Sequence, residues 1–249
     1  MTPALRALLP RTIRPRRIVA GPLRGCWLVT SWHDYPAGLT GRTERALLNW
    51  FSQHVRPGDT WLDVGAHYGY TTFALGRLVG PEGRVFTFEP VPATAGCVDQ
   101  GRALNALPHV VVVPVGLGSA ETIEFRRLAL TRGMADSTLE EAASQWFVQA
   151  GIARFDWLWP GLHGGNDVIH GIKIDVQGME LETLAGMREA LRRWRPRLVL
   201  ELHAGVSRDA VLSLLRDLGY SSDAVAIEPE RGERTAQFLD NHSYVFHPA

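Results

Sequence analysis

The sequence predicts a doubly wound α/β protein with a mostly parallel sheet, and three observations support this. Between residues 60 and 219, short apolar runs alternate with amphipathic helical segments. Several of the runs, such as 109–115 (HVVVVPV), lack polar alternation, which is typical of parallel strands covered on both faces. At 249 residues and 45% hydrophobic, the chain is long enough for one large core and short for two.

The expected elements follow one another in a regular order. Strands are predicted at 60–64, 84–89, 109–115, 171–176 and 196–203, and helices at 69–79, 92–106, 179–193 and 207–219. A helix at 43–55 has Thr43 as its expected N-cap, and Ser207 has this role in the last helix. Residues 121–130 indicate an added strand, and 242–248 an edge strand.

Two regions fall outside this alternation. Residues 17–32 are expected to form a hairpin about Gly21 and Pro22, so we predict a basic N-terminal extension over 1–44 and one α/β domain over 45–249. Residues 131–168 are the least regular part of the sequence and include three tryptophans among glycines. A lid-like insertion over the site is therefore predicted there.

The bulk composition points to a small partner. Lys+Arg and Asp+Glu both number 26, so the chain lacks the basic excess that nucleic-acid binding needs. We therefore expect no nucleic-acid partner. The two cysteines favour a reducing compartment, and we expect a cytoplasmic protein. Pro22 and Arg24 interrupt the only candidate signal segment, and no run approaches the ~18 apolar residues of a membrane span. The oligomeric state is left open.

A glycine turn in residues 61–72 (WLDVGAHYGYTT) predicts a ligand floor, because glycine allows close backbone approach and a helix begins next. The turn lacks the middle glycine of a dinucleotide motif and has no Lys or Arg for a triphosphate. A nucleoside without phosphates fits better, and S-adenosylmethionine is such a ligand. Glu89, 24 positions past Gly65, can accept the ribose hydroxyls, although NAD sites place an acid similarly. An NAD(P)-dependent oxidoreductase is therefore the alternative.

The ordered motifs DVGAHYGYTT, VFTFEPVP, VVVPVGLGS, IKIDVQGMELETLAGM and PRLVLELH resemble the FkbM-type methyltransferases over residues 45–205. The resemblance implies a class I, Rossmann-like methyltransferase domain that uses S-adenosylmethionine. Carried over by position, it implies a cofactor site of Asp63, Gly65, Ala66, His67, Gly69 and Thr71 on the methionine side, Glu89 at the ribose, and Val115 and Gly116 near adenine.

Two positions depart from the family pattern. His67 stands where the family often has Asn, and Gln177 where it often has Glu. The second departure removes a carboxylate from the motif. It keeps open a third function class, a cofactor-binding module without catalysis.

Three polar residues at strand ends are the candidate catalytic groups: Asp175, Glu201 and His203. Methyl transfer to a hydroxyl needs a proton acceptor, and His203, with an unperturbed pKa of about 6.5, is expected to act as the base. Two alternatives stay open: Lys173 and Asp175 form a purely structural ion pair, or the three residues hold a divalent ion, Mg²⁺ or Mn²⁺.

The expected acceptor is a small molecule, and its pocket is predicted to include His33, Tyr35, Trp157 and Trp159. The sequence thus favours an O-methyltransferase that acts on a natural product or a sugar. It does not identify the acceptor.

Overall fold

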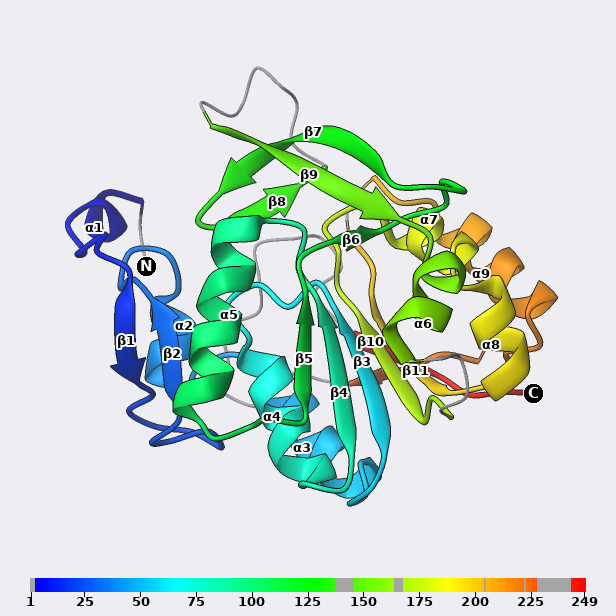
Figure 1. Cartoon of the computed structure of the whole chain (residues 1–249), viewed down its shortest axis with the longest axis horizontal. Helices are drawn as coiled ribbons and strands as arrows, with labels where there is room; N and C mark the ends of the chain where they lie inside the picture. The colour runs from blue at the N-terminus through cyan, green and yellow to red at the C-terminus, as the bar shows by residue number, and fades with distance from the viewer. Residues whose placement is uncertain (1–2, 138–145, 164–167, 204, 222, 228–242) are drawn as a thin grey trace.

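In the part of the chain that the structure describes, the main sheet has seven strands and carries helices on both faces (Figure 1). The structure is a computed structural model that describes residues 3–137, 146–163, 168–203, 205–221, 223–227 and 243–249. In spatial order the strands are β12 (Val225–Ile227), β13 (Ser243–Phe246), β11 (Arg197–Glu201), β10 (Gly171–Ile174), β3 (Thr60–Val64), β4 (Arg84–Phe88) and β5 (Val110–Val113). The five from β11 to β5 are parallel. The predicted doubly wound α/β fold is confirmed.

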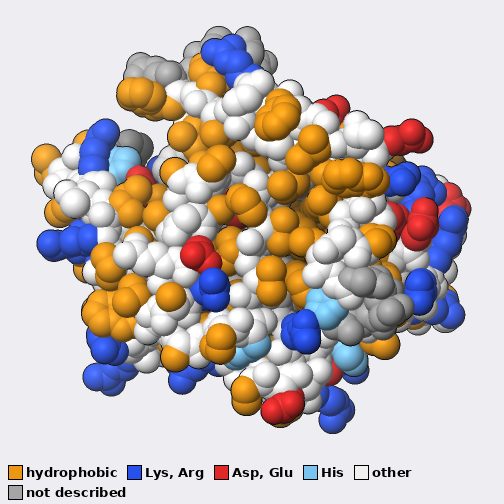
Figure 2. All heavy atoms as spheres, viewed as in Figure 1, with side chains coloured by type: hydrophobic (Ala, Val, Ile, Leu, Met, Phe, Trp, Pro, Cys, Tyr) orange, Lys and Arg blue, Asp and Glu red, His pale blue; other side chains and the backbone are white. Residues whose placement is uncertain are grey.

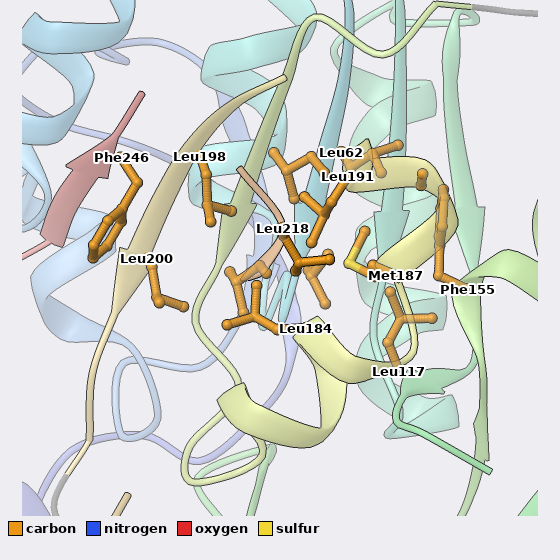
Figure 3. Packing of buried hydrophobic residues seen from close by; sticks show 14 of the residues in the cluster. Leu62, Leu117, Phe155, Leu184, Met187, Leu191, Leu198, Leu200, Leu218 and Phe246 are labelled. Carbon is orange, nitrogen blue, oxygen red and sulfur yellow. The ribbon is translucent and has the colours of Figure 1, made fainter. Parts of the chain in front are cut away.

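The main sheet has a hydrophobic core on each face, and neighbouring residues of one strand pack into different cores. On β3, Trp61 packs with α3 (Arg45–His54), α4 (Tyr70–Val79) and α5 (Pro92–Leu104), while Leu62 packs on the other face. That other face is covered by α6 (Phe155–His163), α7 (Glu180–Ala185), α8 (Arg188–Trp194) and α9 (Arg208–Asp217). Figure 3 shows Phe155 of α6, Leu184 of α7 and Leu191 of α8 in the hydrophobic cluster on this face. Because side chains alternate across a strand, an apolar run buries both of its faces.

The N-terminal segment forms a hairpin as predicted, but its first strand ends at Arg17 and so lies before most of the predicted range 17–32. It consists of β1 (Arg14–Arg17) and β2 (Trp27–Thr30), paired antiparallel and flanked by the short helices α1 (Pro3–Ala7) and α2 (Pro36–Thr40). Ile18 and Leu28 are buried in the same core as Val98 of α5. The hairpin therefore packs on the α/β core, and the boundary between residues 44 and 45 stays a prediction.

A second sheet lies across the carboxyl ends of β3, β4 and β5 (Figure 1). Its strands, in spatial order, are β6 (Gly116–Leu117), β9 (Phe147–Ala153), β7 (Glu124–Thr131) and β8 (Met134–Asp136). The expectation that 131–168 is irregular is wrong for its described part, which contains β8, β9 and α6. These strands are held by pairing with β7, a tertiary contact that local sequence patterns do not reveal.

Two other expectations need correction. The strand near the C-terminus, β13, is not at the edge: all four of its residues are buried, and it pairs antiparallel with both β11 and β12. Thr43 does not cap α3, because Glu44 occupies the N-cap position with a left-handed φ of 56° and without a side-chain capping bond. Ser207 does cap α9, accepting a hydrogen bond from Ala210 N.

The helix expected at 179–193 is broken in two at Gly186. A Cβ at Gly186 would lie 1.9 Å from the carbonyl oxygen of Gly118, so the backbone of β6's loop presses directly on the break. The carboxylate of Asp156 then accepts hydrogen bonds from the amides of Glu189 and Ala190 at the start of α8. Tertiary contacts therefore override the continuous helical pattern.

Within the described part of the chain, no helix has the length and apolar character needed to cross a membrane. On the face in Figure 2, Lys and Arg side chains are scattered, many of them near the rim and some within the face, and they do not gather into one track.

Helix α5 offers a matched test of the packing beneath the site. A Cβ at Gly101 would lie 2.6 Å from the fully buried ring of Phe73, whereas a Cβ at Gly96 in the same helix meets nothing within 4 Å. We expect Gly101→Ala to lower the free energy of unfolding by about 1–3 kcal/mol through overpacking. Gly96→Ala should raise it by up to about 1 kcal/mol through helix propensity. Urea unfolding measures both, and equal midpoints for the two variants would contradict the packing.

Candidate functional site

A cavity opens where the strand order reverses. The chain leaves β3 toward β4 and β5, and later returns to β10 and β11 on the other side of β3. Such a switch point is where open α/β sheets bind ligands. The cavity contains about 1270 Å³ of space free of atoms, part of it open to solvent. Its walls come from the strand ends, including Gly65, Glu89, Gly116, Asp175 and Glu201, and its roof from second-sheet residues, including Leu128, Arg132, Met134 and Ile152.

The glycine turn after β3 is shaped by contact with β10. Gly65 has φ +87°, and a Cβ there would lie 1.8 Å from the carbonyl oxygen of Asp175, so both conformation and space require glycine. Its amide and that of Ala66 point at Phe88 O, at 2.9 and 3.1 Å, and the amide of His67 points at Glu89. These three amides are therefore engaged within the protein. A ligand carboxylate at this turn must therefore find its hydrogen-bond donors elsewhere in the cavity.

A buried ion-pair network lies under this turn. Lys173 Nζ is 3.2 Å from Asp175 Oδ2 and 3.6 Å from Asp63 Oδ1. Asp63 is fully buried and accepts hydrogen bonds from Thr71 at 2.9 Å and from Thr72 at 2.6 Å. Burial opposes the charge of Lys173, but attraction to Asp175 and Asp63 outweighs it and raises the pKa of the ammonium above its ordinary value. The pair of Lys173 and Asp175, an alternative in the sequence analysis, is thus present.

Glu89 projects from the end of β4 into the cavity, and only 3% of it is exposed. Its Oε2 accepts a hydrogen bond from His67 N at 2.8 Å, and its Oε1 one from Val91 N at 2.9 Å. Burial raises the pKa of Glu89 to about 8 despite these two bonds. Each carboxylate oxygen has two lone pairs, so both can accept a further bond from a ligand.

The tip of the β7–β8 hairpin rests on the glycine turn. His67 Nε2 is 3.0 Å from Arg132 O, and Thr94 Oγ1 donates to Gly133 O at 2.5 Å. Burial lowers the pKa of His67 to about 4, so the neutral ring donates its Nε2–H to the carbonyl. The second sheet is thereby fastened over the cavity through its hairpin tip.

The three predicted catalytic residues do converge, but His203 lies behind the other two. Asp175 and Glu201 line the cavity, whereas His203 is 3% exposed and does not line it. His203 Nε2 is 3.4 Å from Asp175 Oδ1 and 3.7 Å from Glu201 Oε1, and its Nδ1 is 2.5 Å from Glu180 Oε1. Burial lowers its pKa, yet the bond to Glu180 and the nearby carboxylates raise it to about 9 overall. The ordinary pKa expected for His203 as a base is therefore not what the structure has.

The other two acids of this group also depart from their ordinary pKa values. Burial works to raise the pKa of Asp175, but Lys173 and His203 hold it below its usual range. Burial and the charge of Asp175 raise the pKa of Glu201 well above its usual range.

Two residues of this cluster were not predicted as site residues. Glu180 is fully buried and bonded to His203. Gln177 Nε2 lies 2.8 Å from His203 Nε2 and 3.3 Å from Asp175 Oδ1. Both belong to the motif IKIDVQGMELETLAGM, so the signal was in the motif rather than in helical periodicity.

The remaining predicted residues divide between the cavity and elsewhere. Ala66, His67, Thr71, Gly116 and Tyr35 line it. Asp63, Gly69, Val115 and His33 are not among the lining residues. Gly69 is the N-cap of α4, Val115 packs on the core, and His33 is paired with Asp34.

The two predicted tryptophans sit on α6, which packs against the face of the main sheet. Trp159 is 2% exposed and stacks on Phe155 in the core, while Trp157 is 48% exposed. Neither lines the cavity, so the structure does not bring them to the space that the other candidate residues share.

This architecture is that of a class I methyltransferase with a Rossmann-like fold. An rRNA methylase from Streptococcus thermophilus has the same fold, with a TM-score of 0.50 at 13% identity over 84% of this chain and 97% of that one. A methyltransferase FkbM from Methylobacillus flagellatus KT gives a TM-score of 0.49 at 16% identity, over 80% of this chain and 50% of that one. The sequence model of the methyltransferase FkbM domain matches residues 63–222, and the chain belongs to this family.

Curated relatives are matched over shorter stretches. A protein-L-isoaspartate O-methyltransferase from Aeropyrum pernix is 41% identical over 64 residues, 26% of this chain. One from Methanopyrus kandleri is 30% identical over 112 residues, 42% of this chain. The chain spans 25% of the first relative's length and 50% of the second's.

The buried network of Lys173 and Asp63 predicts strong coupling between the two. Lys173→Met leaves Asp63 and Asp175 buried without their cation, and should lower the free energy of unfolding by about 3–5 kcal/mol. Asp63→Asn in the same chain should recover part of that loss, because it removes one of the uncompensated charges.

Urea unfolding of the two single variants and the double variant measures the coupling. The exposed pair of Arg102 and Asp99, 2.6 Å apart, is the control, and Arg102→Met should change stability by less than about 1 kcal/mol. Simple additivity of Lys173→Met and Asp63→Asn would show that the buried pair is not coupled.

Proposed function

We propose that the protein is an S-adenosylmethionine-dependent methyltransferase that methylates a hydroxyl group of a small molecule, a natural product or a sugar. The observation that carries the proposal is Glu89. Its buried carboxylate is fixed by two backbone amides at the end of β4, beside the glycine turn and inside the cavity. A carboxylate fixed in this way is suited to accept hydrogen bonds from both hydroxyls of a ribose. Family membership supports methyl transfer over the oxidoreductase alternative.

The residues around Glu89 fit the rest of the cofactor. Leu117, Ile152 and Met179 give the cavity an apolar wall suited to a base such as adenine. Asp175, whose pKa is held below its usual range, lines it elsewhere, and its negative charge favours a ligand that carries positive charge. When bound, S-adenosylmethionine supplies a methyl group already activated by its positively charged sulfur.

The polar end of the cavity is the proposed acceptor site. Tyr35 and Thr43 from the N-terminal part face the same space as Asp175 and Glu201 at the strand ends. Carboxyl oxygens there can accept a hydrogen bond from an acceptor hydroxyl and hold its oxygen in line for displacement. The two curated relatives are named O-methyltransferases, which also favours oxygen as the acceptor atom. The exclusion of nucleic acid and the cytoplasmic location stay predictions from composition.

The affinity for the cofactor should depend on Glu89 and on pH. Glu89→Ala should weaken binding of S-adenosylmethionine by about 1.5–3 kcal/mol, the value of hydrogen bonds to a charged group. Because the ligand-free carboxyl has a pKa of about 8, it must lose a proton before it can accept both hydroxyls. Below pH 8 the affinity should therefore rise by at most tenfold per pH unit, and above pH 8 it should level off.

Titration calorimetry with S-adenosylhomocysteine, the stable product of the cofactor, measures this profile. The control is Glu89→Gln, which keeps the shape and cannot ionise, so dividing the two profiles removes the titration of the ligand itself. Equal affinity of wild type and Glu89→Ala would refute the cofactor assignment. If the affinity of the wild type divided by that of Glu89→Gln does not vary with pH, the role of ionisation is refuted.

Methyl transfer to oxygen should depend on Asp175 after the cofactor has bound. Asp175→Asn keeps the shape of the side chain, so the turnover should fall by about 10²–10⁴-fold while cofactor affinity changes little. Acceptors with hydroxyl, amine and carboxyl groups are incubated with cofactor labelled by ¹³C at the methyl group. The carbon chemical shift of the product then identifies the methylated atom. Nitrogen or carbon methylation would overturn the hydroxyl assignment, and tight binding without any product would favour the non-catalytic module.

A further inference from the structure

We propose that Asp175, Glu201 and His203 form a divalent-metal site, occupied by Mn²⁺ or a similar first-row ion, in the wall of the cavity. One donor atom from each residue lies within 4.8 Å of the other two. His203 Nε2 is 3.4 Å from Asp175 Oδ1 and 3.7 Å from Glu201 Oε1. Ligands bound at about 2.0–2.2 Å from one ion stand about 3.0–3.6 Å apart. The two distances from His203 Nε2 are therefore close to those between bound ligands, and the two carboxylate oxygens start no more than 4.8 Å from each other.

The histidine is oriented by a carboxylate behind it. Its Nδ1 is 2.5 Å from Glu180 Oε1, and both side chains are buried, which leaves Nε2 directed toward Asp175 and Glu201. A metal-binding histidine typically gives its other ring N–H to a carboxylate in this way. The arrangement therefore has the outer support of a metal site as well as its inner donors.

The second oxygen of Asp175 is occupied separately. Lys173 Nζ lies 3.2 Å from Oδ2, while Oδ1 faces His203. The lysine therefore does not take the position of the ion. Glu180 and Glu201 are paired with the same histidine, which lies 2.5 Å from Glu180 Oε1 and 3.7 Å from Glu201 Oε1.

Gln177 supplies a fourth donor after a simple rotation. Its Nε2 lies 2.8 Å from His203 Nε2 and 3.3 Å from Asp175 Oδ1, and its Oε1 is buried without a hydrogen-bond partner among the described residues. Amide nitrogen and oxygen are exchanged by a half turn that moves no carbon atom. The half turn brings Oε1 to the position that Nε2 now occupies, beside His203 Nε2 and Asp175 Oδ1. One imidazole nitrogen and three oxygens suit Mn²⁺ better than Mg²⁺, which prefers oxygen ligands alone.

Binding is tested on the full chain, without cofactor or acceptor, so the outcome is independent of methyl transfer. Equilibrium dialysis against Mn²⁺ should find one ion per chain that chelator removes. Pulsed electron paramagnetic resonance of bound Mn²⁺ should show modulation from an imidazole nitrogen. Absence of that nitrogen signal in the wild type would overturn the proposal without any need for a variant.

Substitutions in the site should change the Mn²⁺ affinity in both directions. His203→Ala and Glu201→Gln should lower the Mn²⁺ affinity by at least about 100-fold, and Gln177→Glu should raise it at least about tenfold by adding a carboxylate. The control is His170→Gln, at the opposite end of the sheet, where His170 Nε2 is 3.8 Å from Asp59 Oδ1. It should leave the affinity unchanged. Wild-type affinity in Glu201→Gln, or a loss in Gln177→Glu, would refute the assignment, and neither result can arise from misfolding if circular dichroism matches the wild type.

Discussion

The buried ammonium of Lys173 is the interaction on which the site depends. It joins β10 to β3 through Asp175 and Asp63, and it also reaches the carbonyl oxygen of Gly65 at 3.4 Å. Asp63 in turn holds the hydroxyls of Thr71 and Thr72 in the first turn of α4. One cation thus fixes the strand ends, the glycine turn and the following helix relative to one another. An unpaired charge at this depth is costly, so these groups are held in place together.

The positions of the strands could be predicted because they depend on patterns among residues that are neighbours in the sequence. Apolar runs such as 109–115 and the break at Gly65 and Gly69 are properties of neighbouring residues, and the structure has strands and a turn there. The roof of the cavity could not be predicted in this way. β8 and β9 exist because they pair with β7, and their sequence alone favours no single state. The same applies to the break at Gly186, which is imposed by Gly118.

For the site, the sequence predicted which polar side chains lie together, but it did not predict the buried surroundings that set their pKa values. Asp175, Glu201 and His203 were expected together because parallel strands end at one edge, and their atoms do converge. The pKa of His203 depends on Glu180, which lies on a different element and approaches only in the folded chain. For the tryptophans at 157 and 159, the predicted position itself differs from the structure. An aromatic segment between glycines suggests a lid, but helix α6 turns Trp159 into the core.

The two departures from the family pattern share one backbone property. His67 has φ +49° and Gln177 φ +52°, and the two turns follow β3 and β10 at the switch point. Glycines of positive φ flank both residues in sequence: Gly65 and Gly69 near His67, and Gly178 next to Gln177. Left-handed backbone in a residue other than glycine costs free energy, and it persists only where the surroundings hold it. For His67 the surroundings are the bond from its amide to Glu89 and the ring contact with Arg132. For Gln177 they are the side-chain bonds to Asp175 and His203. In both turns the strained backbone carries a polar side chain that lines the cavity, so both departures from the family pattern change the chemistry of the cavity wall.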